Sequence, residues 1–116
     1  MNKIEELCRM VNGKYIQSFS WERQYLLEEE YLKTSVILVL MPNLNYLGEK
    51  CLKVTFYGVC DLKYYGLEST ISDLVISIED IRYRQWENCQ YYVYDVEDMF
   101  ALKCEDFDYE WITISE

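Results

Sequence analysis

Alternation of apolar and more polar side chains with a period of two runs through the second half of the chain. Leu52, Val54 and Phe56 show it most clearly, and such spacing places every second residue on one face of an extended strand. The links between such segments are too short for crossover helices, so consecutive strands are expected to pair antiparallel. The segments with this pattern are 52–57, 61–65, 74–81, 91–96, 100–104 and 109–114.

In the first residues of the chain, the apolar side chains recur at helical spacing instead. Apolar residues recur between Ile4 and Val11 at spacings of three and four, which puts them on one helical stripe. Asn2 followed by Glu5 resembles a capping box, and Gly13 is a natural stop. The sequence therefore predicts one short helix at the start of the chain.

Between the helix and the alternating segments the pattern is less regular. Residues 15–30 suit a strand or a loop that leads into a second element. Val36–Leu40 is a short, mostly β-branched run, typical of a strand covered on both faces, and it precedes Pro42, the only proline. We therefore expect a single α+β domain over residues 1–116, with one N-terminal helix packed on a mainly antiparallel β-sheet or meander.

The net charge limits the classes of partner. Hydrophobic residues make up 51% of the chain, which is enough to fold, yet the formal net charge is −10. Such a field repels nucleic-acid phosphates and anionic lipid, and it attracts cationic surfaces. The expected partner is therefore a basic protein, with no direct nucleic-acid contact and no membrane. Pairing of exposed strand edges leaves a homo-oligomer possible.

Catalytic and cofactor signatures are missing from the sequence. The chain contains no histidine, so the usual triads and the common catalytic zinc sites cannot be built. It has only four glycines and no phosphate-binding loop. We therefore expect no metal, no cofactor and no enzyme activity.

Five cysteines are scattered without a C-x-x-C pair. This pattern favours buried, reduced thiols. The first residues carry two glutamates and no long apolar run, unlike a secretory signal, and Val36–Met41 is too short to span a bilayer. A cytoplasmic location is the expectation.

Carboxylates gather towards the end of the chain. Asp106, Asp108 and Glu110 are spaced so that an extended strand would point all three the same way. A hard cation could bind there, although the turn glycine of an EF-hand loop is missing. A solvated strand face or an acidic patch that contacts a partner is the preferred interpretation.

Twelve tyrosines and three tryptophans are many for this length. They favour cross-strand packing or, alternatively, an exposed aromatic interface rimmed by carboxylates. Trp86 could anchor such an interface, or it could fold back over the core. The expected partner-binding residues are Trp86, Glu87, Tyr92, Tyr94, Asp95, Glu97 and Asp98.

Residues 52–112 resemble a group of small bacterial proteins. The segments that carry this resemblance are LKVTFYGVCDLKY, DLVISIEDIRYRQWENCQYYVYDVED and FALKCEDFDYEWI. The similar proteins are candidate immunity proteins of polymorphic-toxin systems. The resemblance implies an intracellular protein that neutralises a toxin domain by occluding it, and it implies no catalytic residues.

Two other functions compete with this one. A nucleic-acid mimic would need a dense, one-sided array of carboxylates spaced like phosphates. A ligand-binding or catalytic domain would need a concave pocket with acidic and aromatic side chains. The candidates for that pocket are Tyr94, Asp95, Glu97, Asp106 and Asp108.

Overall fold

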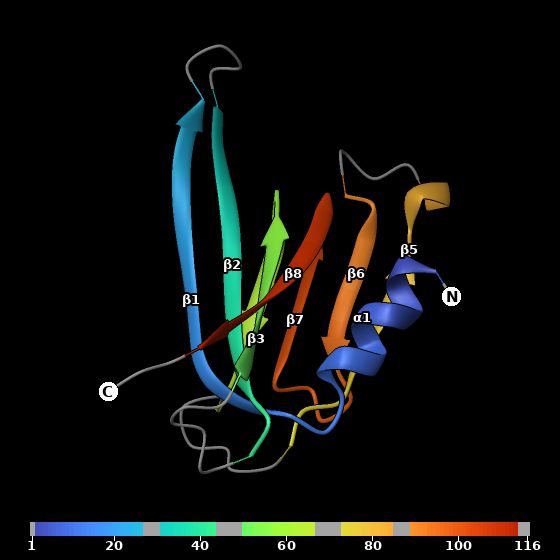
Figure 1. Cartoon of the computed structure of the whole chain (residues 1–116). Coiled ribbons are helices and arrows are strands. Elements are labelled where there is room, and N and C mark those ends of the chain that lie inside the picture. Colours follow the sequence, from blue (N-terminus) through green and yellow to red (C-terminus); the bar gives the residue numbers. More distant parts are fainter. Residues whose placement is uncertain (1, 27–30, 44–49, 67–72, 85–88, 114–116) are drawn as a thin grey trace.

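The computed structural model describes residues 2–26, 31–43, 50–66, 73–84 and 89–113. These residues form one α-helix, one short 3-10 helix and a set of antiparallel strands (Figure 1). The elements in chain order are α1 (Lys3–Val11), β1 (Tyr15–Leu26), β2 (Tyr31–Met41), β3 (Lys50–Tyr57), β4 (Cys60–Tyr64), β5 (Ile76–Asp80), η2 (Arg82–Arg84), β6 (Tyr91–Asp95), β7 (Phe100–Cys104) and β8 (Asp106–Thr113).

The strands are divided between two four-stranded sheets. The strand orders are β1-β2-β3-β8 in the first sheet and β4-β7-β6-β5 in the second. Within each sheet, all neighbouring strands pair antiparallel. The predicted meander is present as β5, β6 and β7, but β8 leaves it and pairs with β3, with Tyr109 opposite Val54. The expectation of one sheet was wrong because a period of two locates strands and does not say which strands pair.

Two strands pass from one sheet into the other at a shared corner. Gly58, between β3 and β4, has a φ of 61°, and Glu105 separates β7 from β8. The backbone N–H of Glu105 donates to the carbonyl of Tyr57 at 2.9 Å, which ties the two bends together. A β-carbon at Gly58 would overlap the side chain of Glu105, so only glycine suits this bend. Such corners allow strands to switch sheets.

Helix α1 has the predicted ends. The Asn2 side chain accepts a hydrogen bond from the backbone N–H of Glu5 at 2.8 Å, and Gly13 follows the helix with a φ of 87°. Leu7 and Val11 are fully buried and belong to the main hydrophobic cluster. Capping chemistry and one apolar stripe therefore explain both the limits and the orientation of the helix.

Polar contacts fix α1 beside the edge strands of both sheets. Lys3 binds the carboxylate of Asp106 at the start of β8. At the other end of the helix, the backbone N–H of Ile76 in β5 donates to the side chain of Asn12 at 3.1 Å. The helix thus bridges β8 and β5.

Both sheets contribute to one hydrophobic cluster. Leu52, Val54 and Phe56 of β3 are buried, whereas the residues between them are partly exposed, as predicted. The segment left open by the sequence, residues 15–30, contains the 12-residue strand β1. Other members of the cluster are Val36, Leu38, Leu40, Leu74, Ile76, Ile78, Val93, Phe100, Leu102, Cys104 and Phe107.

The cysteines are not all reduced thiols as expected. Cys60 of β4 and Cys89, just before β6, are joined by a disulfide, whereas Cys8 and Cys104 have free thiols. Burial raises the pKa of the Cys104 thiol to about 12. In the described part of the chain, no helix has the length and apolar character needed to cross a membrane.

Candidate functional site

Two tyrosines of β6 lie on the outer surface of the second sheet. Tyr92 and Tyr94 are half-buried, and their rings stack with centroids 5.0 Å apart. Val93 between them is fully buried in the core. The predicted alternation along β6 is therefore confirmed, and it brings two of the expected contact residues together.

Asp95 does not lie on the surface, contrary to its expected place among the contact residues. Its side chain is 1% exposed. One carboxylate oxygen accepts hydrogen bonds from the backbone N–H groups of Glu97 at 3.1 Å and Met99 at 3.3 Å. In the alternation of β6, Asp95 lies on the same side as the buried Val93. Its role in the structure is to shape the turn between β6 and β7.

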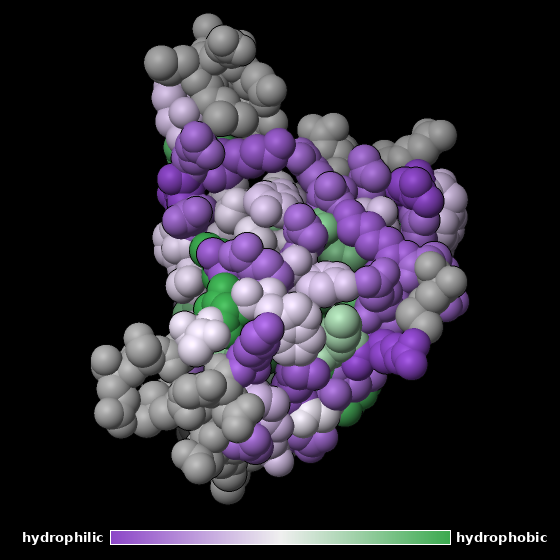
Figure 2. Space-filling model, in the orientation of Figure 1, coloured by the Kyte–Doolittle hydropathy of each residue, from purple (hydrophilic) through white to green (hydrophobic). Residues whose placement is uncertain are grey.

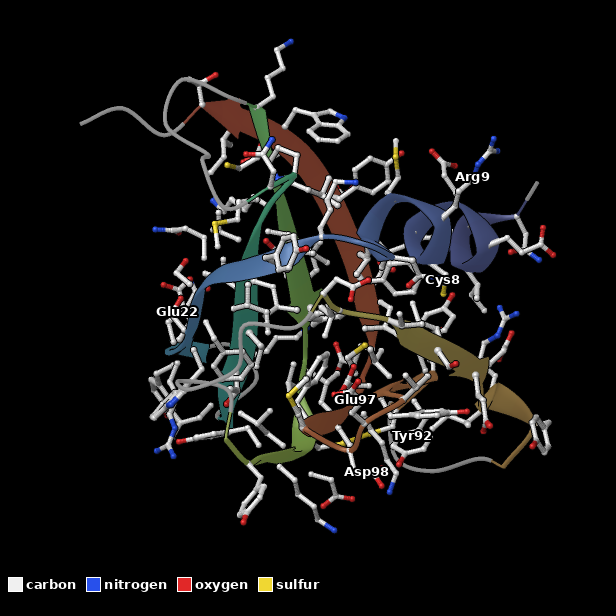
Figure 3. The ribbon with its side chains drawn as sticks, turned by 90° about the horizontal axis from the view of Figure 1, so that it is seen from below. Cys8, Arg9, Glu22, Tyr92, Glu97 and Asp98 are labelled. Carbon is white, nitrogen blue, oxygen red and sulfur yellow. A yellow bond between two sulfur atoms is a disulfide. The ribbon has the colours of Figure 1, made fainter. Side chains whose placement is uncertain are left out.

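The two carboxylates of that turn point into solvent. Glu97 and Asp98 are exposed, and no described residue forms an ion pair with either. The backbone N–H of Asp98 donates to the carbonyl of Asp95 at 3.0 Å, and Asp98 has a φ of 58°. Figure 3 shows Tyr92, Glu97 and Asp98 away from the helix that carries Cys8 and Arg9. We call the surface formed by Tyr92, Tyr94, Glu97 and Asp98 the tyrosine face.

The cross-strand neighbour of Tyr92, Lys103, pairs with another carboxylate, Asp61. The ammonium of Lys103 lies 2.9 Å from a carboxylate oxygen of Asp61. The pKa of Asp61 lies below its ordinary value, chiefly because of the hydrogen bond from Lys103 and also because of the charge of Lys63. The carboxylates of the tyrosine face are thus left without a described cationic partner.

Two of the expected contact residues lie outside the described part of the chain, and two exposed tyrosines were not expected. Trp86 and Glu87 lie outside the described residues, so their place remains a prediction. Sequence reasoning missed Tyr64 and Tyr65, which are 55% and 82% exposed at the end of β4. Two adjacent tyrosines directly before Gly66, where a strand was expected to end, were the available signal.

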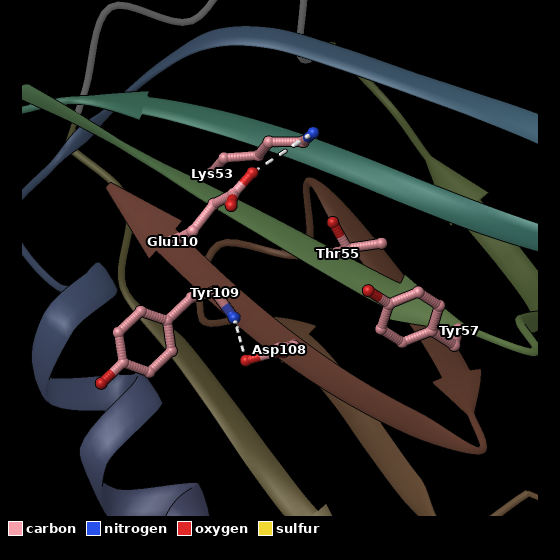
Figure 4. A pocket seen from close by; sticks show the side chains of 6 residues that line it. All are labelled: Lys53, Thr55, Tyr57, Asp108, Tyr109 and Glu110. Atoms are coloured by element: carbon pink, nitrogen blue, oxygen red, sulfur yellow. Dashed lines mark hydrogen bonds and ion pairs between the residues drawn. The ribbon is translucent and has the colours of Figure 1, made fainter. Parts of the chain in front are cut away.

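The acidic row of β8 lies on the outer surface of the first sheet. Asp106, Asp108 and Glu110 are all exposed and alternate with less exposed residues, as predicted. Lys3 pairs with Asp106, and the ammonium of Lys53 lies 3.6 Å from Glu110. A hollow of about 160 Å³ lies beside this row. Figure 4 shows the side chains that line it. Among the described residues, no group of three or more metal-ligating side chains converges.

The residues that were candidates for a ligand-binding or catalytic pocket do not come together in the structure. Asp106 and Asp108 lie on the first sheet, whereas Glu97 lies at a turn of the second sheet and Asp95 is buried. The described carboxylates are also distributed over the helix and both sheets, and several pair with lysine or arginine. On the side of the molecule shown in Figure 2, hydrophilic residues are widely spread. The described carboxylates that were candidates for an acidic pocket therefore do not form one.

Comparison with protein families gives a match over nearly the whole chain. Residues 1–110 match the family described as Immunity protein PIM8. Comparison with curated proteins and with solved structures gave no match. The family match agrees with the resemblance of residues 52–112 and extends it through the N-terminal helix. The chain belongs to the PIM8 family of immunity proteins.

Proposed function

We propose that this protein neutralises a toxin by binding it and covering its functional surface, without catalysing a reaction. The observation that carries this proposal is the family match over residues 1–110, because an immunity protein implies a toxin partner. The separation of the candidate catalytic carboxylates between two sheets supports a binding role. Neutralisation by occlusion requires only a tight, correctly placed contact.

The toxin surface is proposed to be basic. The formal net charge of −10 would attract a cationic partner and accelerate its association. Glu97 and Asp98 add two exposed carboxylates that no described cation neutralises.

The tyrosine face is the proposed contact surface. Its stacked pair, Tyr92 and Tyr94, offers rigid aromatic area with hydroxyl groups at the edge, a composition enriched at the centres of protein interfaces. The adjoining Glu97 and Asp98 supply the charge. Asp95 holds the turn that presents them, so its contribution to binding is indirect.

The test uses the toxin domain encoded beside the gene for this chain. The double variant Glu97→Gln, Asp98→Asn should associate about tenfold more slowly at low ionic strength, because steering depends on local charge. A matched control, Glu22→Gln with Asp108→Asn, removes the same charge elsewhere; Figure 3 shows Glu22 away from Tyr92. Equal slowing by both pairs would reject the tyrosine face. A wild-type chain that neither binds nor protects against this toxin would reject the function.

A further inference from the structure

A second hollow adjoins the tyrosine face at the edge of the second sheet. Its volume is about 210 Å³. Pockets for drug-sized ligands usually hold about 300–1,000 Å³, so this space suits one side chain better than a small-molecule substrate. The residues that line it are Lys63, Tyr64, Tyr65, Asp98, Phe100 and Ala101.

One of the residues that line the hollow, Ala101, is smaller than its neighbours on the adjacent strands. Ala101 of β7 lies opposite Lys63 of β4 on one side and Tyr94 of β6 on the other. Its methyl group leaves space that a longer side chain would fill. The hollow and the tyrosine face share Asp98, and Tyr94 is the cross-strand neighbour of Ala101.

The ring of one wall residue, Tyr64, and the backbone of the other, Tyr65, are held in place before any partner binds. The ring of Tyr64 packs against Phe19 of β1, with centroids 5.4 Å apart. The backbone N–H of Tyr65 donates to the carbonyl of Met99 at 2.7 Å. Both tyrosines nevertheless remain more than half exposed, at 55% and 82%. A preformed but open wall lowers the entropy lost on binding.

The hollow contains one carboxylate that can pair with a cationic occupant, beside one lysine. Asp98 contributes an exposed carboxylate with no ion pair to a described residue. The other charged residue of the lining, Lys63, forms no ion pair with Asp98, so this carboxylate remains available to an incoming cation. A guanidinium group can pair with a carboxylate through two parallel hydrogen bonds and can stack on a tyrosine ring.

We propose that this hollow receives an arginine side chain from the toxin, with its guanidinium group paired to Asp98 and its stem against Tyr64 and Tyr65. The inference rests on the proposed function and names the chemistry of one anchor in that contact. An arginine suits the site because its apolar stem and planar cation match the aromatic wall and the carboxylate at the same time.

The first experiment needs no toxin. Nα-acetyl-arginine N-methylamide is titrated into isotope-labelled protein, with the neutral citrulline analogue as the comparison. The arginine compound should give saturable NMR shifts at Tyr65, Asp98 and Ala101 and should bind about five- to tenfold more tightly than the citrulline compound. Asp98→Asn should abolish that difference. Equal binding of the two compounds, or shifts confined to another surface, would overturn the assignment.

Asp98→Asn is suited to this test because the backbone there has a φ of 58°, which asparagine tolerates. Glu97→Gln is the matched control, because Glu97 lies at the same turn and does not line the hollow. This control should keep the preference for arginine. Loss of the preference in both variants would show a general charge effect and reject the hollow.

The second experiment fills the hollow in the full toxin complex. Ala101→Leu removes space without changing charge and should speed toxin dissociation at least tenfold, whereas Ala101→Ser should leave dissociation near the wild-type rate. Thermal melts show whether each variant folds, and Asp98→Asn provides an independent readout if the leucine variant is unstable. Normal dissociation of both Ala101→Leu and Asp98→Asn would overturn the arginine site and leave the immunity function intact. Failure of the wild type to bind the toxin would instead reject that function.

Discussion

Replacement of Asp95 should destabilise the protein although the residue lies in an acidic surface segment of the sequence. Its carboxylate accepts two backbone hydrogen bonds, at 3.1 and 3.3 Å, in a side chain that is 1% exposed. Hydrogen bonds to charged groups contribute about 1.5–3 kcal/mol each, and these two are long, so about 3 kcal/mol is lost with them. The other carboxylate oxygen has no described partner, so removing it relieves part of the burial cost. We expect Asp95→Ala to lower the free energy of unfolding by about 2 kcal/mol.

The assay is thermal and urea unfolding followed by circular dichroism. An unfolding entropy of roughly 2.1 cal/mol/K per residue, over 116 residues, converts 2 kcal/mol into a melting temperature about 8 °C lower. Asp95→Asn keeps an acceptor oxygen and should cost about half as much. Glu97→Gln is the exposed control and should stay within about 0.5 kcal/mol. If Asp95→Ala behaves like this control, the assigned role of Asp95 in the turn is wrong.

Two further predictions concern titratable groups. With a pKa of about 12, the Cys104 thiol should react with iodoacetamide at pH 8 about a thousandfold more slowly in the folded protein than in urea, as followed by mass spectrometry; similar rates would contradict its burial. Lys103→Gln should raise the pKa of Asp61 towards its ordinary value, measured by NMR titration. Because the folded pKa is the lower one, this contact stabilises the wild type at neutral pH and is lost as the pH falls through that pKa, so the variant should be less sensitive to acid.

Local chemistry explains which parts of the fold could be predicted from the sequence. Capping by Asn2 and termination near Gly13 depend on neighbouring residues, and the helix limits were correct. The alternation in β3 and β6 likewise identified the buried faces. The pairing of β3 with β8 joins distant segments, and nothing in either strand selects that partner over others. The division into two sheets could therefore not be predicted.

In the candidate site, too, features set by neighbouring residues could be predicted, whereas features set by long-range strand pairing could not. Strand alternation correctly placed Tyr92 and Tyr94 on one side. The error at Asp95 arose because its charge was given more weight than its position in the alternation. The hollow beside Ala101 depends on the pairing of Ala101 with Lys63. This register follows from the long-range pairing of β4 with β7 and from a bulge in β4. Its arginine-binding role had no signature in the sequence.

The shared corner at Gly58 and Glu105 also has a consequence for cooperativity. Because β3 continues into β4 and β7 continues into β8, the hydrogen-bonded ladder of one sheet leads directly into that of the other. Opening either sheet would pull on strands that the other sheet needs. The sheets are therefore expected to unfold together as one unit. A population of this protein would then consist of fully folded, binding-competent molecules and unfolded ones, without a half-folded form that holds its toxin weakly.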